Sequence, residues 1–304
     1  MRILIAGAGA TGGAFGTRLV EAGRDVTFLV RGERAEALRA SGLRFIGPDE
    51  DRTNPVVVVT AEELAATSEL ADLILLAVKA GGLESIIDDL RPAVGPNTLI
   101  IPFLNGMAHI DRLREEFPDQ VLGGLVKIVG TMRGYDVVQM TDLATMTIGR
   151  LGGGEVPAAI VEALDVPGFR LQVIDSVDDA LWEKWVFIAA AGVVTCLFRA
   201  PVGAIMAAGG EPHVVAIIDE LEAVAMRAGH PVSARARAAT LSMLTAEGSS
   251  FTSSLYRDVT AGLPNETEHI LGHLAATAAG LGVATPLLDL TLVQLRAGEI
   301  DRSD

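Results

Sequence analysis

Cysteine and positive charge are both scarce in this sequence. Cys196 is the single cysteine among 304 residues, so no disulfide can form within the chain and nothing indicates an oxidising compartment. The chain carries 24 Lys and Arg against 39 Asp and Glu, a formal net charge of -15. This excess of negative charge would repel phosphate backbones and anionic lipids. We therefore expect neither nucleic acid nor a membrane as a partner.

The sequence also lacks a long hydrophobic segment. Its first residues form a short apolar run that leads directly into a glycine-rich turn, unlike the longer apolar segment of a signal peptide. The longest apolar stretch elsewhere, Trp185 to Phe198, is shorter than the roughly 20 residues of a membrane-spanning helix, and it predicts a buried helix. A cytoplasmic location is the resulting expectation.

The first half of the chain alternates short Val/Ile/Leu-rich runs with helix-like stretches, which is typical of a parallel sheet with helices on both faces. Parallel strands are predicted near residues 2–6, 25–30, 56–60, 73–78 and 98–102. Further strands, appended to this sheet as antiparallel hairpins, are predicted at residues 121–132, 137–140, 144–148 and 171–174.

The pattern changes near residue 176. From residue 177 onward Ala, Leu and Glu recur at helical spacing, with interruptions at Pro201, Gly209, Pro231 and Pro264. We therefore expect two domains: a doubly wound α/β domain at residues 1–176 and an all-helical domain at residues 177–304, which would complete the active site.

A glycine-rich hexapeptide, GAGATG, follows the first predicted strand and precedes a helix. This context makes the pattern G-x-G-x-x-G a specific signal for a Rossmann-type dinucleotide-binding fold. Gly7 would permit the tight turn, Gly9 the approach of the pyrophosphate, and Gly12 the close packing of the helix on the strand. Ala10 and Thr11 would present the first helical N–H groups to the phosphates. The alternative is an ordinary strand-to-helix turn.

The residue after the second predicted strand favours NADP(H) as the cofactor. NAD enzymes usually place an Asp or Glu there against the ribose 2'-hydroxyl, whereas this chain has Arg31. A guanidinium can bind a 2'-phosphate in bidentate fashion, and Arg34 would assist it. Glu33 opposes this assignment, and the alternative for Arg31 is a solvated surface charge.

Over almost its full length, the chain resembles the ketopantoate reductase family. The members of this family are the 2-dehydropantoate 2-reductases of pantothenate biosynthesis. Beyond the GAGATG turn and Arg31, the resemblance rests on the segments LLAVKA at 75–80, PFLNGM at 102–107, LWEK at 181–184, SSL at 253–255 and NE at 265–266. It implies NADPH-dependent reduction of a 2-oxo acid, either ketopantoate to pantoate or a related ketone.

The resemblance also implies roles for particular residues. Lys184 matches the catalytic lysine, which would stabilise the charge on the substrate's carbonyl oxygen and donate the proton as a general acid. Glu266 would orient that ammonium group. Asn105 would hydrogen-bond the substrate near the nicotinamide, Ser254 would bind the substrate's polar end, and Lys79 would face the cofactor or the substrate.

Simpler interpretations remain open for these residues. Lys184 can be a solvent-facing charge at the start of a helix, although a lysine beside an apolar helix is costly unless a cavity or partner receives it. Asn105 can serve an Asn-Gly turn. Ser254 and Glu266 lie in polar runs that are typical of loops.

The sequence departs from the family in the helix that follows Lys184. Family members usually carry asparagines four and eight residues after the lysine, on its face of the helix. Here those positions hold Ile188 and Gly192. We expect them to line the substrate pocket, with open space at Gly192, and to favour a less polar or bulkier substrate than ketopantoate.

Two other functions stay open at this stage. One is a sibling reductase that acts on a less polar carbonyl or imine compound with Lys184 in the same role. The other is a non-catalytic NADP(H)-binding sensor, which would not need Lys184 and Glu266 together. A homodimer is compatible with either.

No metal site is predicted, because the histidines do not form a ligand constellation. We expect Cys196 in the core. On helix surfaces we expect His109, His213, His230, His269 and His273.

Overall fold

The computed structural model describes residues 1–67 and 69–303, with side chains described up to residue 300. The chain divides into two compact units. The first comprises Met1–Leu104 and His109–Val177, and the second comprises Asn105–Ala108 and the chain from Asp178 onward. The main division lies one residue beyond the expected boundary. The grouping of Asn105–Ala108 with the helical unit is a difference from the expectation.

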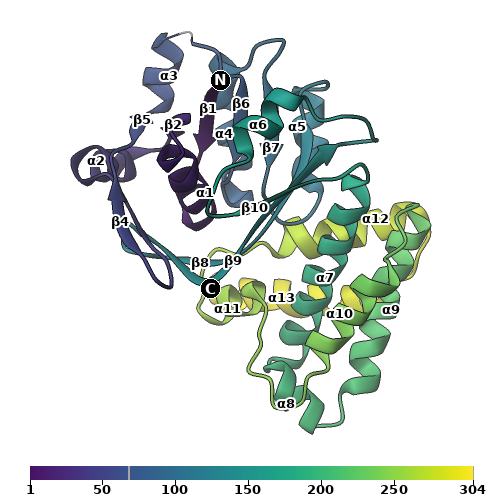
Figure 1. Ribbon diagram of the computed structural model, residues 1–304. Coiled ribbons are helices and arrows are strands. Elements are labelled where there is room, and N and C mark those ends of the chain that lie inside the picture. The colour runs from purple at the N-terminus through teal and green to yellow at the C-terminus, as the bar shows by residue number, and fades with distance from the viewer. Residues whose placement is uncertain (68, 304) are drawn as a thin grey trace. The chain divides into compact units, whose positions relative to one another are not determined.

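The first unit contains the predicted doubly wound sheet (Figure 1). Its strands are β1 (Arg2–Ala6), β2 (Asp25–Leu29), β5 (Val57–Val59), β6 (Leu73–Leu76) and β7 (Leu99–Pro102). They lie in the order β5-β2-β1-β6-β7, and all neighbouring strands run parallel. The order reverses direction between β1 and β6. Doubly wound sheets bind their ligands at such a switch point, outside the carboxyl ends of the strands.

Helices cover both faces of this sheet because the strand side chains alternate in direction. Ile3 and Ile5 of β1 join a core with residues of α1, α2 and α6, whereas Leu4 and Ala6 join a core with residues of α3, α4 and α5. The helices are α1 (Ala10–Glu21), α2 (Gly32–Ser41), α3 (Ala61–Thr67), α4 (Leu83–Leu90), α5 (Ala108–Glu116) and α6 (Ala158–Leu164). Both faces of the sheet are therefore buried.

A second sheet corrects the prediction of appended hairpins. Its strands are β3 (Leu43–Ile46), β4 (Asp51–Asn54), β8 (Leu122–Arg133), β9 (Asp136–Arg150) and β10 (Arg170–Val173). The β8–β9 hairpin is antiparallel as expected, but β9 also pairs in parallel with β3 and β10. The two strands predicted at 137–140 and 144–148 are one strand, β9, which pairs with β8 on both sides of a register shift between Ile128 and Gly130. The strands β3 and β4 were not predicted. The sequence of β4, DRTN, is polar and gives no apolar pattern.

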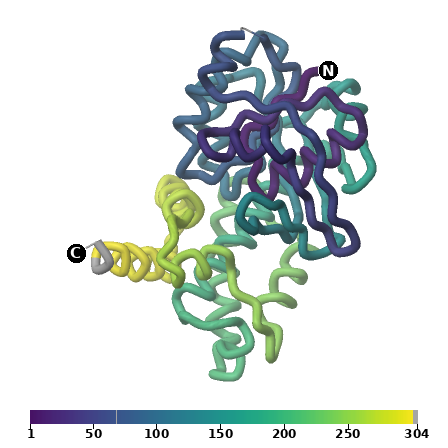
Figure 2. Tube along the Cα trace, turned by 90° about the vertical axis from the view of Figure 1, so that its left-hand side faces the viewer, coloured from purple at the N-terminus to yellow at the C-terminus, as the bar shows by residue number. Residues whose placement is uncertain are grey.

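The second unit is helical, and Figure 2 follows it from green to yellow. Its elements are α7 (Val177–Phe198), α8 (Val202–Ala207), α9 (Glu211–Arg227), α10 (Ala234–Leu244), α11 (Ser254–Thr260), the π-helix η3 (Glu268–Gly272), α12 (His273–Leu281) and α13 (Pro286–Ser303). The predicted interruptions all fall between these elements. Among the described residues, α7 alone is long and apolar enough to cross a membrane, but 67% of its apolar window is buried. Its apolar residues supply much of the core of this unit, so α7 is a core helix.

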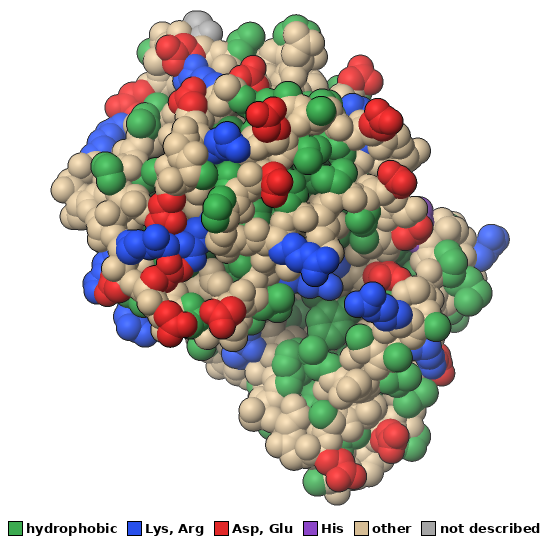
Figure 3. Space-filling view, in the orientation of Figure 1, with side chains coloured by type: hydrophobic (Ala, Val, Ile, Leu, Met, Phe, Trp, Pro, Cys, Tyr) green, Lys and Arg blue, Asp and Glu red, His purple; other side chains and the backbone are tan. Residues whose placement is uncertain are grey.

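Acidic and basic side chains are interspersed on the face of the first unit that Figure 3 shows. Arg18 forms ion pairs with Glu21 and Glu50, and Arg44 pairs with Asp51 and Asp136. Many of the positive charges are thus balanced by carboxylates beside them.

Candidate active site

The GAGATG turn has the geometry that its glycines predict. Gly7 has a φ of +100°, a conformation that L side chains rarely adopt, and a Cβ there would lie 2.8 Å from the carbonyl oxygen of Ala77. A Cβ at Gly12 would lie 2.0 Å from the carbonyl oxygen of Gly7. These two glycines let the chain turn sharply and bring α1 close to the strands.

The start of α1 is accessible to an anion. The N-cap residue, Gly9, makes no capping hydrogen bond with a side chain, and a Cβ built on it would meet no atom within 4 Å. Ala10 and Thr11, in the first turn, are partly exposed. Free space beside Gly9 and uncapped N–H groups at a helix start are what a pyrophosphate group requires. These residues therefore fit the phosphates of a dinucleotide.

Arg31 and Arg34 differ in their surroundings. Arg31 follows β2, its side chain is 56% exposed, and it forms an ion pair with Asp89 of α4. Arg34 is held beside the glycine turn, because its Nη2 donates to the carbonyl oxygen of Ala8 at 2.7 Å. Glu33, which opposed the NADP assignment, accepts a hydrogen bond from the hydroxyl of Tyr135 at 3.0 Å. Arg31 is thus the more exposed of the two guanidinium groups.

Lys79 lies at the carboxyl side of β6, as predicted. It is exposed and directly precedes the short 3-10 helix η1 (Ala80–Gly82). Its position is on the ligand-binding edge of the sheet, next to β1 in the strand order.

Asn105 follows β7 in a tight turn. Gly106 has a φ of +80°, and a Cβ there would lie 3.1 Å from the carbonyl oxygen of His269. The Asn-Gly turn is therefore real, but the Asn105 side chain does more than support it. Its Nδ2 donates to Oε2 of Glu266 at 3.2 Å, across 161 positions of sequence. The turn brings the two polar residues together within the helical unit.

His269 is a neighbour of this pair that the sequence did not single out. It is half-buried and lies in the π-helix η3, and such wide turns are frequent at functional sites. Burial lowers the pKa of His269, while the Glu266 carboxylate and a hydrogen bond to the backbone of Asn105 oppose that shift. Burial therefore favours the neutral imidazole, whose hydrogen bond to the backbone of Asn105 supports the turn. The sequence feature that could have placed His269 near this pair is its position three residues after Glu266.

Lys184 is half-buried and lies inside α7, which begins at Val177. The alternative of a charge at the start of a helix is therefore wrong. The next residue, Trp185, is 1% exposed, and its Nε1 donates to the carbonyl oxygen of Ile270 at 3.0 Å. This bond ties the helix that carries Lys184 to the π-helix that follows Glu266. Ile188, one turn further along the same face, is also half-buried.

Two predicted pocket residues have other surroundings than expected. A Cβ at Gly192 would lie 3.2 Å from Leu255 and 3.7 Å from Leu271, so the expected open space at Gly192 is filled by leucine side chains. Ser254 is exposed as the first residue of α11. The buried serine is Ser253, which caps α11 by accepting from the N–H of Tyr256 at 3.0 Å.

Comparison with known proteins shows the family. The family model described as "Ketopantoate reductase PanE/ApbA" matches residues 3–153, and the model described as "Ketopantoate reductase PanE/ApbA C terminal" matches residues 176–299. The chain belongs to the ketopantoate reductase family. It is accordingly an oxidoreductase, and the resemblance inferred from the motifs is confirmed.

Three relatives within and around this family are informative. An uncharacterised oxidoreductase, YkpB of Bacillus subtilis (strain 168), is 32% identical over 99% of this chain and 100% of its own length. The crystal structure of 2-dehydropantoate 2-reductase from Methylococcus capsulatus is 26% identical, with a TM-score of 0.87 over 100% of this chain and 98% of that one. D-mandelate dehydrogenase with NADH and anilino(oxo)acetate has the same fold, at 22% identity and a TM-score of 0.87 over 99% of both chains.

In this ketopantoate reductase family member, the expectation of surface histidines is wrong in part. His109 is fully buried, and His269 is half-buried. His230 pairs with Asp179 at 2.7 Å and stacks on Trp182, with ring centroids 5.5 Å apart. These tertiary surroundings are not revealed by a spacing pattern alone.

Cys196 lies in the core, as predicted. It is 2% exposed, and burial raises the pKa of its thiol to about 12. The thiol is therefore protonated at neutral pH and is not a nucleophile.

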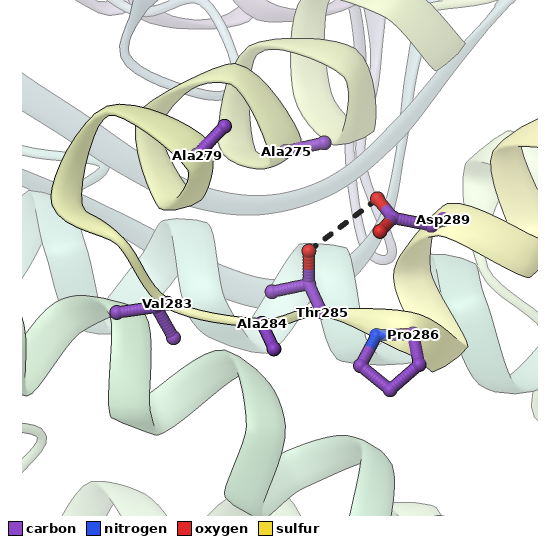
Figure 4. Close-up of a pocket in the computed structure, with 7 residues that line it drawn as sticks. All are labelled: Ala275, Ala279, Val283, Ala284, Thr285, Pro286 and Asp289. Carbon is purple, nitrogen blue, oxygen red and sulfur yellow. Dashed lines mark hydrogen bonds between the residues drawn. The ribbon is translucent and has the colours of Figure 1, made fainter.

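An open cavity of about 260 Å³ lies elsewhere in the helical unit, between α12 and the start of α13 (Figure 4). Small apolar side chains line it, together with Thr285 and Asp289, whose side chains bond to each other at 3.4 Å. None of the predicted site residues lines this cavity.

Proposed function

We propose that this protein reduces a 2-oxo acid to the corresponding 2-hydroxy acid with NADPH as the hydride donor, and that Lys184 is its general acid. The observation that carries the proposal is the bond between Asn105 and Glu266, which joins two of the family's motifs at 3.2 Å within the unit that also holds Lys184. A sensor of cofactor state would not need this polar pair.

When bound, NADPH would supply the hydride that reduces the carbonyl carbon of the substrate. Negative charge then develops on the carbonyl oxygen, and the ammonium of Lys184 stabilises it and donates the proton. The negative charge of Glu266 attracts and orients that ammonium group in this proposal. The same carboxylate also accepts a hydrogen bond from the amide of Asn105. One N–H of the Asn105 amide is held in this way, and the second N–H of the same group is the donor that we propose for the substrate. Ser254 binds the substrate's polar end in this proposal.

The substrate that we favour is a 2-oxo acid less polar than ketopantoate. Ile188 replaces an amide on the face of α7 that carries Lys184, and the leucines beside Gly192 leave an apolar wall further along. A site without hydrogen-bonding groups for the substrate's hydroxyl would not discriminate in favour of ketopantoate. The similarity to D-mandelate dehydrogenase, a 2-hydroxy acid enzyme by name, supports an apolar or aromatic side chain on the substrate.

The test is steady-state turnover of the purified protein with NADPH and a panel of 2-oxo acids. The panel contains ketopantoate, straight and branched aliphatic 2-oxo acids, and benzoylformate. We expect at least one apolar 2-oxo acid to be reduced with a kcat/KM above about 10⁴ M⁻¹s⁻¹. Absence of turnover with every member, by a folded protein that binds NADPH, would favour the sensor instead.

NADPH is proposed as the preferred cofactor because Arg31 occupies the position that binds a 2'-phosphate in NADP enzymes. We predict that Arg31→Ala weakens NADPH binding about tenfold to a hundredfold and leaves NADH binding nearly unchanged, since a hydrogen bond to a charged group contributes about 1.5–3 kcal/mol. Dissociation constants from the quenching of intrinsic fluorescence measure this. Equal losses for both cofactors would contradict the assignment.

A further inference from the structure

Arg31 does not face the solvent alone. It forms an ion pair with Asp89 of α4. The Asp89 side chain is 21% exposed, against 56% for Arg31. The carboxylate is therefore the more buried partner, and the guanidinium is the more accessible one. The pair joins the segments that follow β2 and β6, the two strands that flank β1 in the sheet. It therefore lies at the edge where the ribose end of a dinucleotide binds.

We propose that Asp89 is a specificity-determining residue that limits the preference of this protein for NADPH over NADH. This inference rests on the proposed function. A 2'-phosphate bound by Arg31 would lie within about 7 Å of the Asp89 carboxylate, because both anions would contact one guanidinium group. The carboxylate repels the phosphate and competes for the same N–H donors. NADH, which has a neutral 2'-hydroxyl, experiences neither effect.

The size of the effect follows from Coulomb's law. A phosphate of charge near -2 and a carboxylate about 7 Å apart in water repel each other enough to change a dissociation constant by about tenfold. Salt reduces this repulsion, since the screening length at physiological ionic strength is about 8 Å. A threefold to tenfold shift is therefore expected when the charge of Asp89 is removed.

The test compares Asp89→Asn with Asp88→Asn. Asp88 is the adjacent residue of α4, its side chain is 65% exposed, and it pairs with Arg91 instead of Arg31. Both variants remove one negative charge from the same helix, so the general electrostatic change is matched. Dissociation constants for NADPH and NADH are measured at low and at physiological salt for both variants and the wild type.

We expect Asp89→Asn to tighten NADPH binding about threefold to tenfold at low salt, to leave NADH binding within about twofold, and to lose part of its effect as salt rises. Asp88→Asn should change the ratio of the two affinities by less than about twofold. In the Arg31→Ala background Asp89→Asn should have a smaller effect on NADPH, because the shared guanidinium is gone.

Weaker NADPH binding by Asp89→Asn would overturn the proposal, since Asp89 would then orient Arg31 for the phosphate. An equal change for both cofactors, or the same ratio as in Asp88→Asn, would also overturn it. Thermal melting checks that the variant folds, and Asp89→Ser replaces it if it does not. A wild type that binds neither cofactor would instead refute the proposed function, so the two failures are distinguishable.

Discussion

At the scale of single residues, the proposed general acid is a cation inside an apolar helix. Lys184 is half-buried in α7, between Glu183 and the buried Trp185. A charged group in partly desolvated surroundings interacts more strongly with a developing oxyanion than it would in water. The position of Lys184 therefore suits a general acid better than it suits a surface charge.

We predict that Lys184→Ala lowers kcat by about a hundredfold or more and leaves the NADPH dissociation constant within about twofold, because the lysine acts on the transition state. Steady-state kinetics and fluorescence titration measure the two quantities. Lys127→Ala, at an exposed lysine of β8, is the matched control and should have wild-type kinetics. Normal turnover by Lys184→Ala would refute its catalytic role.

Ile188 is the residue that we expect to reject ketopantoate. We predict that Ile188→Asn raises kcat/KM for ketopantoate by about tenfold to a hundredfold, because one regained hydrogen bond to a charged substrate contributes about 1.5–3 kcal/mol. Ile188→Val, which stays apolar, is the control. Gly192 is left unchanged, since an asparagine there would collide with Leu255. The prediction fails if the wild type already reduces ketopantoate at a kcat/KM above about 10⁴ M⁻¹s⁻¹.

At the scale of elements, two glycines of the GAGATG turn have different roles, one in folding and one in ligand binding. Gly12 packs against the backbone of Gly7, whereas Gly9 faces space that the protein does not fill. The fold therefore requires a glycine at position 12, whereas the glycine at position 9 leaves room for a ligand beside the start of α1.

Two substitutions in this turn should therefore behave differently. We predict that Gly9→Ala keeps the melting temperature of the wild type and weakens NADPH binding at least tenfold, because its methyl group occupies the space of the pyrophosphate. Gly12→Ala should destabilise the fold by about 1–3 kcal/mol through overpacking. Thermal melting and cofactor titration of both variants measure the contrast. Unimpaired NADPH binding by Gly9→Ala would show that the cofactor does not use this turn.

The π-helix η3 is the corresponding element of the helical unit. A π-turn leaves a carbonyl group without its usual helical partner, and here the indole of Trp185 donates to the carbonyl of Ile270. Lys184, one residue before Trp185, is thereby held in a defined register with the chain around Glu266. The proposed general acid thus lies on a helix that the Trp185 side chain ties to η3, the element that follows Glu266.

At the scale of the whole molecule, the two units have separate hydrophobic cores. Two clusters cover the faces of the parallel sheet, and a third fills the helical unit. The glycine turn, Arg31 and Lys79 all belong to the first unit, whereas Asn105, Lys184, Ile188 and Glu266 belong to the second.

This division predicts where the cofactor protects the chain. Saturating NADPH should slow amide hydrogen exchange most in β1, the glycine turn and the start of α1, by up to about a hundredfold at a concentration of 100 Kd, because bound ligand stabilises only the closed state. Mass spectrometry of exchanged peptides measures it, with 5'-AMP as a control that lacks the 2'-phosphate. Protection confined to the helical unit would contradict a cofactor site at β1.

Features that depend on local geometry could be predicted from the amino-acid sequence. The alternation of apolar runs and helical stretches predicted the strands β1, β2, β5, β6 and β7 and their parallel direction, but not their order in the sheet. The glycines of the turn specify a backbone conformation that few other residues adopt, and proline and glycine ended the helices where they were expected. Several short motifs, taken together in their order along the chain, indicated the family for the same reason, because each consists of neighbouring residues.

Contacts between residues far apart in the sequence, in contrast, are visible only in the folded chain. The bond from Asn105 to Glu266 spans 161 positions, and the pair of Arg31 with Asp89 spans 58. No periodicity encodes such contacts, since they result from how strands and helices pack. For that reason the sequence did not predict the leucines that fill the space at Gly192. It did not predict strand β4 either, because the polar side chains of β4 give no apolar pattern. Side-chain packing between elements, unlike backbone preference within them, is a property of the whole fold.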